Sequence, residues 1–265
     1  KMINFYGKLP GKRAVILGSG DIGLIMARRL TLEGVKVEAV LEIMEHSSGL
    51  RRNIRQCIED FNIPLKFSHT VTRVVGKDRV EGVYYAQVDE NRKPILSTEK
   101  LLECDCLLLS VGLIPENSLL PESVKRNKFV IVDDERQTSE EGIFISGNVL
   151  HIHDLADNAT EEGEIAGKFA GLYSQGKLEK FDKVNLSFSK NISYCMPSLI
   201  NKKNEGKFTI YMRANANFLK KNILVKCGGE VIAKKFCIGI TTGEMQEIEV
   251  EYSKVKDDIF VDIEE

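Results

Sequence analysis

The sequence has 265 residues, enough for two domains or for one large one. Charged residues make up 29% of the chain and nearly balance, with a formal net charge of −2. Nucleic acid is therefore not expected as the main partner, because its binding needs a concentrated basic face. No apolar run approaches the ~20 residues that cross a bilayer, so no membrane span is expected. No secretory signal opens the chain, and the six cysteines show no CxxC spacing, which favours a reduced, cytoplasmic location.

The first region, residues 1–113, alternates short apolar runs with helical patterns. Strands are expected at 14–17, 36–41 and 63–67, and helices at 22–33 and 49–61. In the first helix the apolar residues Ile22, Ile25, Met26 and Leu30 have helical spacing and are expected to form its apolar face, and Gly34 ends it. This alternation predicts a parallel sheet covered by helices.

After residue 70 the pattern changes to a period of two. Three strands of a β meander are expected at 71–75, 80–88 and 95–101, with turns at 76–78 and 89–91. A buried strand is expected within CLLLSVG, residues 106–112. Together these elements predict a Rossmann-like α/β domain over residues 1–113.

Two further domains are predicted, over residues 114–182 and 183–265. The first holds a polar strand at 129–132 and a helix at 160–175. Small residues on one side of that helix allow close approach of another group: Gly163, Ala166, Gly167, Ala170 and Gly171. The second has no helical period and carries short strands at 208–213, 223–227, 231–236, 247–251 and 259–263, with a hairpin turn at Gly228-Gly229. It is predicted to be a small antiparallel β domain.

A G-x-G-x-x-G motif lies between the first strand and the first helix, which is the context that a dinucleotide site requires. Gly18 makes the tight turn, Gly20 lets a pyrophosphate approach the backbone, and Gly23 allows close packing of helix on strand. The free N–H groups at the helix start then face the anion. The predicted site residues of this turn are Gly18, Ser19, Gly20, Asp21, Ile22 and Gly23. Asp21 can also cap the helix start. The alternative is a turn whose glycines serve packing alone.

Glu42 follows the second strand, at the place where an acidic residue binds the ribose hydroxyls of NAD. A carboxylate there repels a 2′-phosphate, so NAD is favoured over NADP. Arg51 and Arg52 come close behind and can still fold back toward this place, which keeps NADP open.

Two later segments, followed by a helix rich in small residues, resemble the FAD-dependent pyridine nucleotide-disulfide oxidoreductases. These segments are SVGLIPE, residues 110–116, and QTSEEGIFISGNV, residues 137–149. The resemblance implies an NAD domain inserted into an FAD domain, with cofactor contacts at Gly112, Gly147 and Asn148. GSGDIGLIMARRLTLEG and GNVLHIHDLAD are similar to a narrower branch. This branch contains the flavoprotein subunits encoded beside anaerobic glycerol-3-phosphate dehydrogenases and the α subunits of opine, proline and cyanide-forming amine dehydrogenases. YCMPSLI and TIYMRA are similar to its C-terminal region.

Three features depart from the family pattern. No second glycine-rich turn precedes Val15, so the chain is expected to be a C-terminal portion of a longer flavoprotein. Asn148 stands where the family has an aspartate, and its amide can hydrogen-bond a ribityl hydroxyl or a phosphate oxygen. Ile25 stands where related enzymes often carry a glutamate near the nicotinamide.

Other residues with possible chemistry favour structural roles. Cys104 and Cys106 are expected on the same strand face, where core packing is favoured over a strained redox pair. His151 and His153 find no third metal ligand with suitable spacing, so no metal site is predicted; a flavin contact or a role at the helix entry remains. No Ser/His/Asp spacing indicates a hydrolase.

The sequence therefore predicts the NAD(H)-binding portion of an oxidoreductase that passes hydride between NADH and the FAD of the full-length protein, and that is inactive alone. Its partners are expected to be NADH, FAD, and another subunit or the missing FAD half. The alternative is a nicotinamide-nucleotide-binding and subunit-contact module without catalysis of its own. No individual catalytic residue is predicted.

Overall fold

The computed structural model describes residues 1–264. Its contacts divide the chain into two compact units, Lys1–Gly112 and Leu113–Glu265. The predicted division into residues 1–113, 114–182 and 183–265 stays a prediction.

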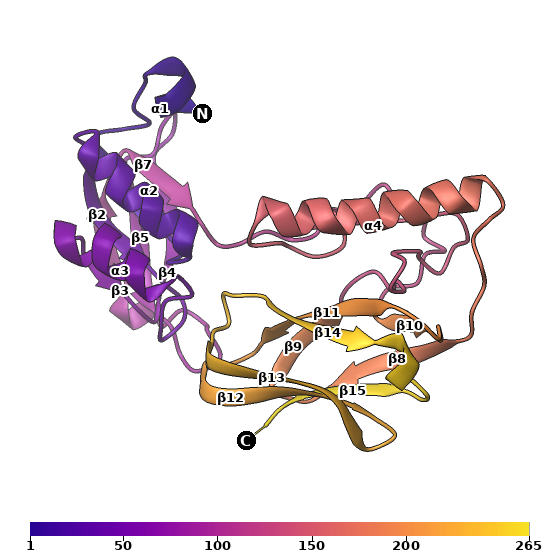
Figure 1. The fold of residues 1–265 in the computed structure, drawn as a ribbon. Coiled ribbons are helices and arrows are strands. Elements are labelled where there is room, and N and C mark those ends of the chain that lie inside the picture. The colour runs from indigo at the N-terminus through magenta and orange to yellow at the C-terminus, as the bar shows by residue number, and fades with distance from the viewer. Residues whose placement is uncertain (265) are drawn as a thin grey trace. The chain divides into compact units, whose positions relative to one another are not determined.

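A parallel four-stranded sheet forms the centre of the first unit, with strand order β3-β2-β1-β7 (Figure 1). Its strands are β1 (Arg13–Leu17), β2 (Lys36–Leu41), β3 (Leu65–Lys66) and β7 (Cys106–Leu109). The helices are α1 (Met2–Tyr6), α2 (Asp21–Leu32) and α3 (Arg51–Cys57), the last followed by a 3-10 turn at Glu59–Phe61. The strand–helix alternation in the sequence thus yields the predicted α/β sheet.

Helix α2 packs on the sheet through Leu24, Ala27 and Leu30, which are fully buried. The predicted apolar face was therefore partly wrong: Ile22 is 69% exposed and Ile25 is 45% exposed. The apolar residues of α2 cover more than one face, and only the stripe through Leu24 meets the sheet.

The other face of the sheet is covered by an antiparallel meander of β4 (His69–Val75), β5 (Gly82–Gln87) and β6 (Lys100–Glu103). The strand predicted at 95–101 was misplaced, because Leu96–Thr98 forms a 3-10 turn instead. There the Thr98 hydroxyl oxygen accepts a hydrogen bond from the Gln87 amide, which replaces a ladder bond between backbones.

Cys104 and Cys106 pack on opposite faces of the parallel sheet, so their predicted common face was wrong. Cys104 belongs to the core below the meander, and Cys106 packs against the core below the helices. The chain bends at Asp105, whose carboxylate accepts hydrogen bonds from the backbone N–H groups of Lys12 and Arg13. Both thiols are free and serve packing.

The second unit contains helix α4 (Ala156–Ser174) and two stacked sheets (Figure 1). The helix begins four residues before its predicted start. One sheet has strand order β10-β8-β15-β12-β13 and the other β14-β11-β9. The strands are β8 (Lys183–Phe188), β9 (Ile192–Met196), β10 (Leu199–Asn201), β11 (Lys207–Ala214), β12 (Phe218–Cys227), β13 (Glu230–Ile240), β14 (Gln246–Glu251) and β15 (Ile259–Ile263). Short 3-10 turns lie at Gly147–Val149 and Tyr252–Lys254.

Three features of this unit differ from the prediction. Strands β8, β9 and β10 were missed. The sheet is not wholly antiparallel, because β15 and β8 pair in parallel. The strand predicted at 129–132 forms only isolated bridges, of Val130 with Arg126 and of Val132 with Thr138. Among the helices of residues 1–264, none is long and apolar enough to cross a membrane.

Candidate functional site

The turn after β1 has the geometry that its glycines predict. Gly18 has a φ of +102°, and a Cβ there would lie 2.0 Å from the Ser110 carbonyl oxygen. A Cβ on Gly23 would lie 2.5 Å from the Gly18 carbonyl oxygen. Both distances are shorter than a side chain tolerates, so α2 approaches the strand ends only because these positions carry no side chain.

Hydrogen-bond donors are available at the start of α2. Within residues 1–264, no protein group accepts from the backbone N–H groups of Asp21, Ile22 and Gly23. A Cβ on Gly20 would meet only the Ser48 hydroxyl, at 3.6 Å, so the approach to these donors is open. This arrangement fits a phosphate group, because the helix start offers both N–H donors and the positive end of the dipole.

Glu42 closes the turn from the end of β2. Its Oε2 accepts hydrogen bonds from the Ser19 backbone N–H at 2.8 Å and from the Ser19 hydroxyl at 2.6 Å. Its Oε1 accepts one from the Met44 amide at 2.9 Å. The carboxylate is buried, with the residue 6% exposed, so it is already held by the protein and offers its remaining lone pairs to a ligand.

Asp21 does not cap α2, contrary to the expectation. The N-cap is Gly20, without a side-chain cap. Instead, the Asp21 Oδ1 accepts hydrogen bonds from the Leu50 amide at 2.8 Å and from the Asn53 side chain at 2.7 Å. Asp21 therefore ties the nucleotide turn to the beginning of α3.

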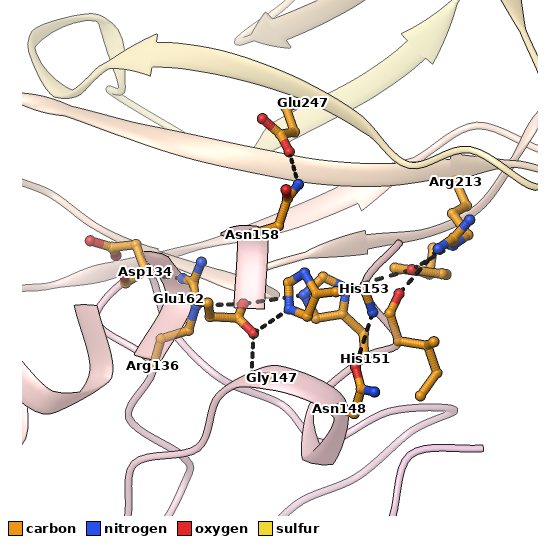
Figure 2. Close-up of polar contacts among 12 residues, drawn as sticks. Asp134, Arg136, Gly147, Asn148, His151, His153, Asn158, Glu162, Arg213 and Glu247 are labelled. Carbon is orange, nitrogen blue, oxygen red and sulfur yellow. Dashed lines mark hydrogen bonds and ion pairs between the residues drawn. The ribbon is translucent and has the colours of Figure 1, made fainter. Parts of the chain in front are cut away.

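A second cluster lies in the other unit and centres on Glu162, in the interior of α4 (Figure 2). Its Oε1 accepts hydrogen bonds from Arg136 Nε at 2.9 Å and His151 Nε2 at 3.2 Å. Its Oε2 accepts from the Gly147 backbone N–H at 2.7 Å and His153 Nε2 at 2.9 Å. No side chain of this cluster is more than 2% exposed.

The electrostatics of this cluster favour an ionised Glu162 carboxylate and a neutral His151 imidazole. Burial alone would raise the pKa of Glu162, but hydrogen bonds from His151 and His153 and the charge of Arg136 outweigh it and hold the pKa far below its ordinary value. Burial lowers the pKa of His151 from its ordinary value. An ionised carboxylate only accepts, so each ring carries its hydrogen on Nε2.

Two tyrosines from the three-stranded sheet surround the histidines. Tyr194 on β9 lies with its hydroxyl 3.5 Å from His151 Nδ1, and Arg213 Nε donates to that hydroxyl at 3.1 Å. The Arg136 guanidinium lies 5.8 Å from the ring centre of Tyr211 on β11. Burial raises the pKa of Tyr211 to about 12. Both tyrosines therefore stay neutral and close the cluster off from solvent.

His151 and His153 do not line a cofactor surface, so the flavin contact predicted for their side chains was wrong. Both rings turn inward to Glu162 and pack against β9 and β11. Gly147 and Asn148 belong to the turn that precedes these histidines, and the Gly147 N–H donates inward to Glu162. Gly147 has a φ of +66° with no atom within 4 Å of a built Cβ, and Asn148 is exposed. Gly112 also has a positive φ, +86°, beside open space.

Sequence reasoning missed Glu162 and Arg136. The available signal was the position of Glu162 one turn before the buried Ala166, which places a carboxylate in the buried stripe of α4. Arg136 gave no such signal, because it belongs to a turn in the left-handed conformation with a φ of 68°.

Glu162 also provides the third ligand-type group that the sequence lacked beside the two histidines. The ligand atoms of His151, His153 and Glu162 lie within 4.8 Å of one another. However, Arg136 already binds the carboxylate, so a divalent cation would stand beside a buried guanidinium. The carboxylate is satisfied by hydrogen bonds alone, whereas the buried His153 Nδ1 has no partner within residues 1–264; we assign the cluster no metal.

Comparison with known proteins agrees with the nucleotide-turn geometry. The family model of the pyridine nucleotide-disulphide oxidoreductases matches residues 4–163. The chain belongs to this family. Its members are flavoprotein oxidoreductases that use NAD(P)H and FAD. The predicted family and the α/β fold class are therefore confirmed.

The chain is similar to several oxidoreductases. A thioredoxin reductase of Treponema pallidum is 25% identical over 167 residues, which cover 61% of this chain and 51% of that protein. An NADH oxidase of Methanocaldococcus jannaschii is 26% identical over 174 residues, which cover 59% of this chain and 36% of that protein. This chain thus spans about half, or less, of the curated relatives it matches.

Solved structures show the same likeness. The thioredoxin reductase of T. acidophilum aligns with a TM-score of 0.53 and 32% identity over 62% of this chain and 53% of that one. A ferredoxin reductase from Rhodopseudomonas palustris aligns with a TM-score of 0.51 over 91% of this chain and 56% of that one. At 17% identity, the second likeness concerns the fold alone.

Proposed function

We propose that this chain is the NAD(H)-binding portion of an FAD-dependent oxidoreductase and passes electrons between NADH and flavin. The turn from Gly18 to Gly23 carries this proposal, because it joins open N–H donors at the start of α2 to a buried carboxylate at the end of β2. The N–H groups bind the pyrophosphate of NADH, and Glu42 accepts hydrogen bonds from a ribose hydroxyl. Flavin, when bound, supplies the two-electron chemistry.

The exposed side of the Gly147–Asn148 turn is the proposed flavin-facing surface of the second unit, and Gly112 stays a separately predicted cofactor contact in the first unit. Because Gly147 has no side chain and open space beside it, a cofactor can approach the backbone there closely. No group within residues 1–264 binds the Asn148 amide nitrogen. These features fit a polar cofactor whose oxygens accept hydrogen bonds. The residues of this turn position the cofactor, and no side chain here is assigned a proton transfer.

The nucleotide preference tests the first half of the proposal. NADH should bind more tightly than NADPH, because the Glu42 carboxylate repels a 2′-phosphate. Calorimetric titration of parent protein, Glu42→Gln and Glu45→Gln measures this; Glu45 is exposed three residues further on and serves as the matched control. Glu42→Gln should weaken NADH binding by about 1–3 kcal/mol, and Glu45→Gln should not. NADPH binding that equals or exceeds NADH binding would contradict the role of Glu42.

The second half concerns FAD. Residues 1–264 hold one glycine turn at a helix start, and NADH occupies it in this proposal. The FAD pyrophosphate is then held by a further FAD-binding segment or by another subunit, and the chain by itself binds FAD weakly. Gel filtration with FAD and an absorption spectrum of the protein peak measure this. Stoichiometric yellow protein would overturn this assignment of the glycine turn. NADH binding without any FAD binding would favour a module without catalysis.

We also propose a cytoplasmic location. All six cysteines are free thiols, and five of them are buried. A protein built with several unpaired buried thiols suits a reducing compartment. Fractionation of cells that express the chain, with a cytoplasmic marker beside it, checks this location.

A further inference from the structure

Glu162 connects parts of the chain that are far apart in sequence. Its donors come from Arg136, from the Gly147 backbone, and from the two histidines of the following segment. All of its partners are buried or belong to the inner side of the turn (Figure 2). The proposed electron transfer assigns this carboxylate no role, so its presence in a helix interior needs another explanation.

The connection runs on from Glu162 to the exposed side of the turn. Gly147 donates its backbone N–H to one carboxylate oxygen, and the ring of His153 donates to the same oxygen. The backbone N–H of His153 in turn donates to the Asn148 side-chain oxygen at 3.1 Å. This bond uses the oxygen of the amide, and the Asn148 nitrogen has no partner within residues 1–264, so its two hydrogens are free.

We propose that Glu162 is a positioning residue, which holds the Gly147–Asn148 turn so that Asn148 presents its amide nitrogen as a hydrogen-bond donor. The group recognised there is an acceptor oxygen, such as a phosphate or carbonyl oxygen of the flavin nucleotide. Only the identity of this ligand rests on the proposed function; the positioning by Glu162 stands on the hydrogen bonds themselves.

The carboxylate is required because every partner donates. A glutamine has the same size but replaces one oxygen with an NH₂ group. That NH₂ group would face either Arg136 and His151 or Gly147 and His153. In both cases its N–H groups would point at other N–H donors, and the hydrogen bonds on that side would be lost. Glu162→Gln therefore disturbs the cluster around Glu162, which we call the hub, without removing volume. Glu164→Gln makes the same chemical change at an exposed position of the same helix.

Nuclear magnetic resonance of the labelled 265-residue chain tests the positioning without any ligand. In the parent, His151 and His153 should both carry a hydrogen on Nε2, and the Gly147 amide should show the downfield shift of a short bond to a carboxylate. Glu162→Gln should move the Gly147, His153 and Asn148 side-chain amide signals, whereas Glu164→Gln should leave them in place. Nδ1–H tautomers in the parent, or unchanged signals in folded Glu162→Gln, would overturn the proposal. So would Zn²⁺ binding in an equimolar titration.

Titration with FAD tests the ligand. FAD should shift the Asn148 side-chain amide, and Glu162→Gln should weaken this binding about tenfold, the loss expected for one hydrogen bond. Asn148→Ala, which lies at the surface and leaves the hydrogen bonds of Glu162 in place, should weaken it similarly because alanine offers no donor. Unchanged or tighter FAD binding by Asn148→Ala would overturn the donor role. A parent in which FAD moves no signal of this turn, while Glu162→Gln still moves Gly147, would contradict the proposed flavin surface and leave the positioning role supported.

Discussion

The buried charge of Glu162 makes the stability of the second unit depend on pH. The folded state keeps this carboxylate ionised, since its pKa is held far below 4.5, and it keeps His151 neutral, since burial lowers the pKa of that ring below 6.5. On acidification the unfolded chain therefore takes up protons that the folded chain refuses, first at His151 and then at Glu162. Both groups destabilise the fold as the pH falls, and neither does so at higher pH.

Between pH 7.5 and 5.5, the free energy of unfolding should fall in the parent because the unfolded state protonates His151 below its ordinary pKa of 6.5. His151→Gln should flatten this dependence, because the group that titrates in the unfolded state is gone. Urea unfolding at several pH values measures it, with His69→Gln as the control variant outside the cluster. A parent whose stability rises on acidification over this range would show that His151 is protonated in the fold.

At the scale of elements, glycines in two helices differ in whether a side chain would fit at their position. In α2, a Cβ on Gly23 would meet the Gly18 backbone oxygen at 2.5 Å. In α4, a Cβ on Gly167 would have no atom within 4 Å. The gain in helix propensity on changing glycine to alanine is similar in both helices, so the difference between the two substitutions isolates the cost of the backbone clash.

Gly167→Ala should stabilise the second unit by up to about 1 kcal/mol, because alanine restricts the unfolded chain and fits without contact. Gly23→Ala should destabilise the first unit and weaken NADH binding, because α2 must move away from the turn. Thermal unfolding and NADH titration measure both changes. Loss of stability in Gly167→Ala would mean that another part of the protein packs against this face of α4.

Sequence patterns predicted the elements whose signals are local. The turn at Gly18, helix α2 and the first strands follow from residue spacing within each element. The hub around Glu162 could not be predicted in this way, because Arg136 lies 26 positions from Glu162, and Tyr194 lies 43 positions from His151. Strands β8 to β10 were missed, although β8 and β9 are as long as the predicted β14 and β15. These two pair with strands that lie farther along the chain, β8 with β15 and β9 with β11.

The face of α2 was misjudged for a different physical reason. Ile22 and Ile25 are as hydrophobic as Leu24, and periodicity alone does not say which stripe meets the sheet. Close approach at Gly23 decides it, because the helix turns this glycine and its neighbour Leu24 toward the strand ends. Ile22 and Ile25 are left exposed beside the open donors of α2.

At the scale of the whole molecule, each of the two compact units has hydrophobic clusters of its own. A unit with its own core can unfold separately, so we expect two transitions in calorimetry of the chain. Gly23→Ala should lower the transition of the first unit, and Gly167→Ala should raise that of the second, which assigns each transition without a further probe.

NADH should then raise only the transition that Gly23→Ala lowers, because its binding residues lie within the first unit. At a free concentration one hundred times the Kd, binding adds about 2.7 kcal/mol to the stability of the folded unit that holds it. NADPH at the same concentration should add less, since Glu42 disfavours its 2′-phosphate. If both transitions rise together with NADH, the two units share the binding energy, and the nucleotide site extends beyond the turn at Gly18.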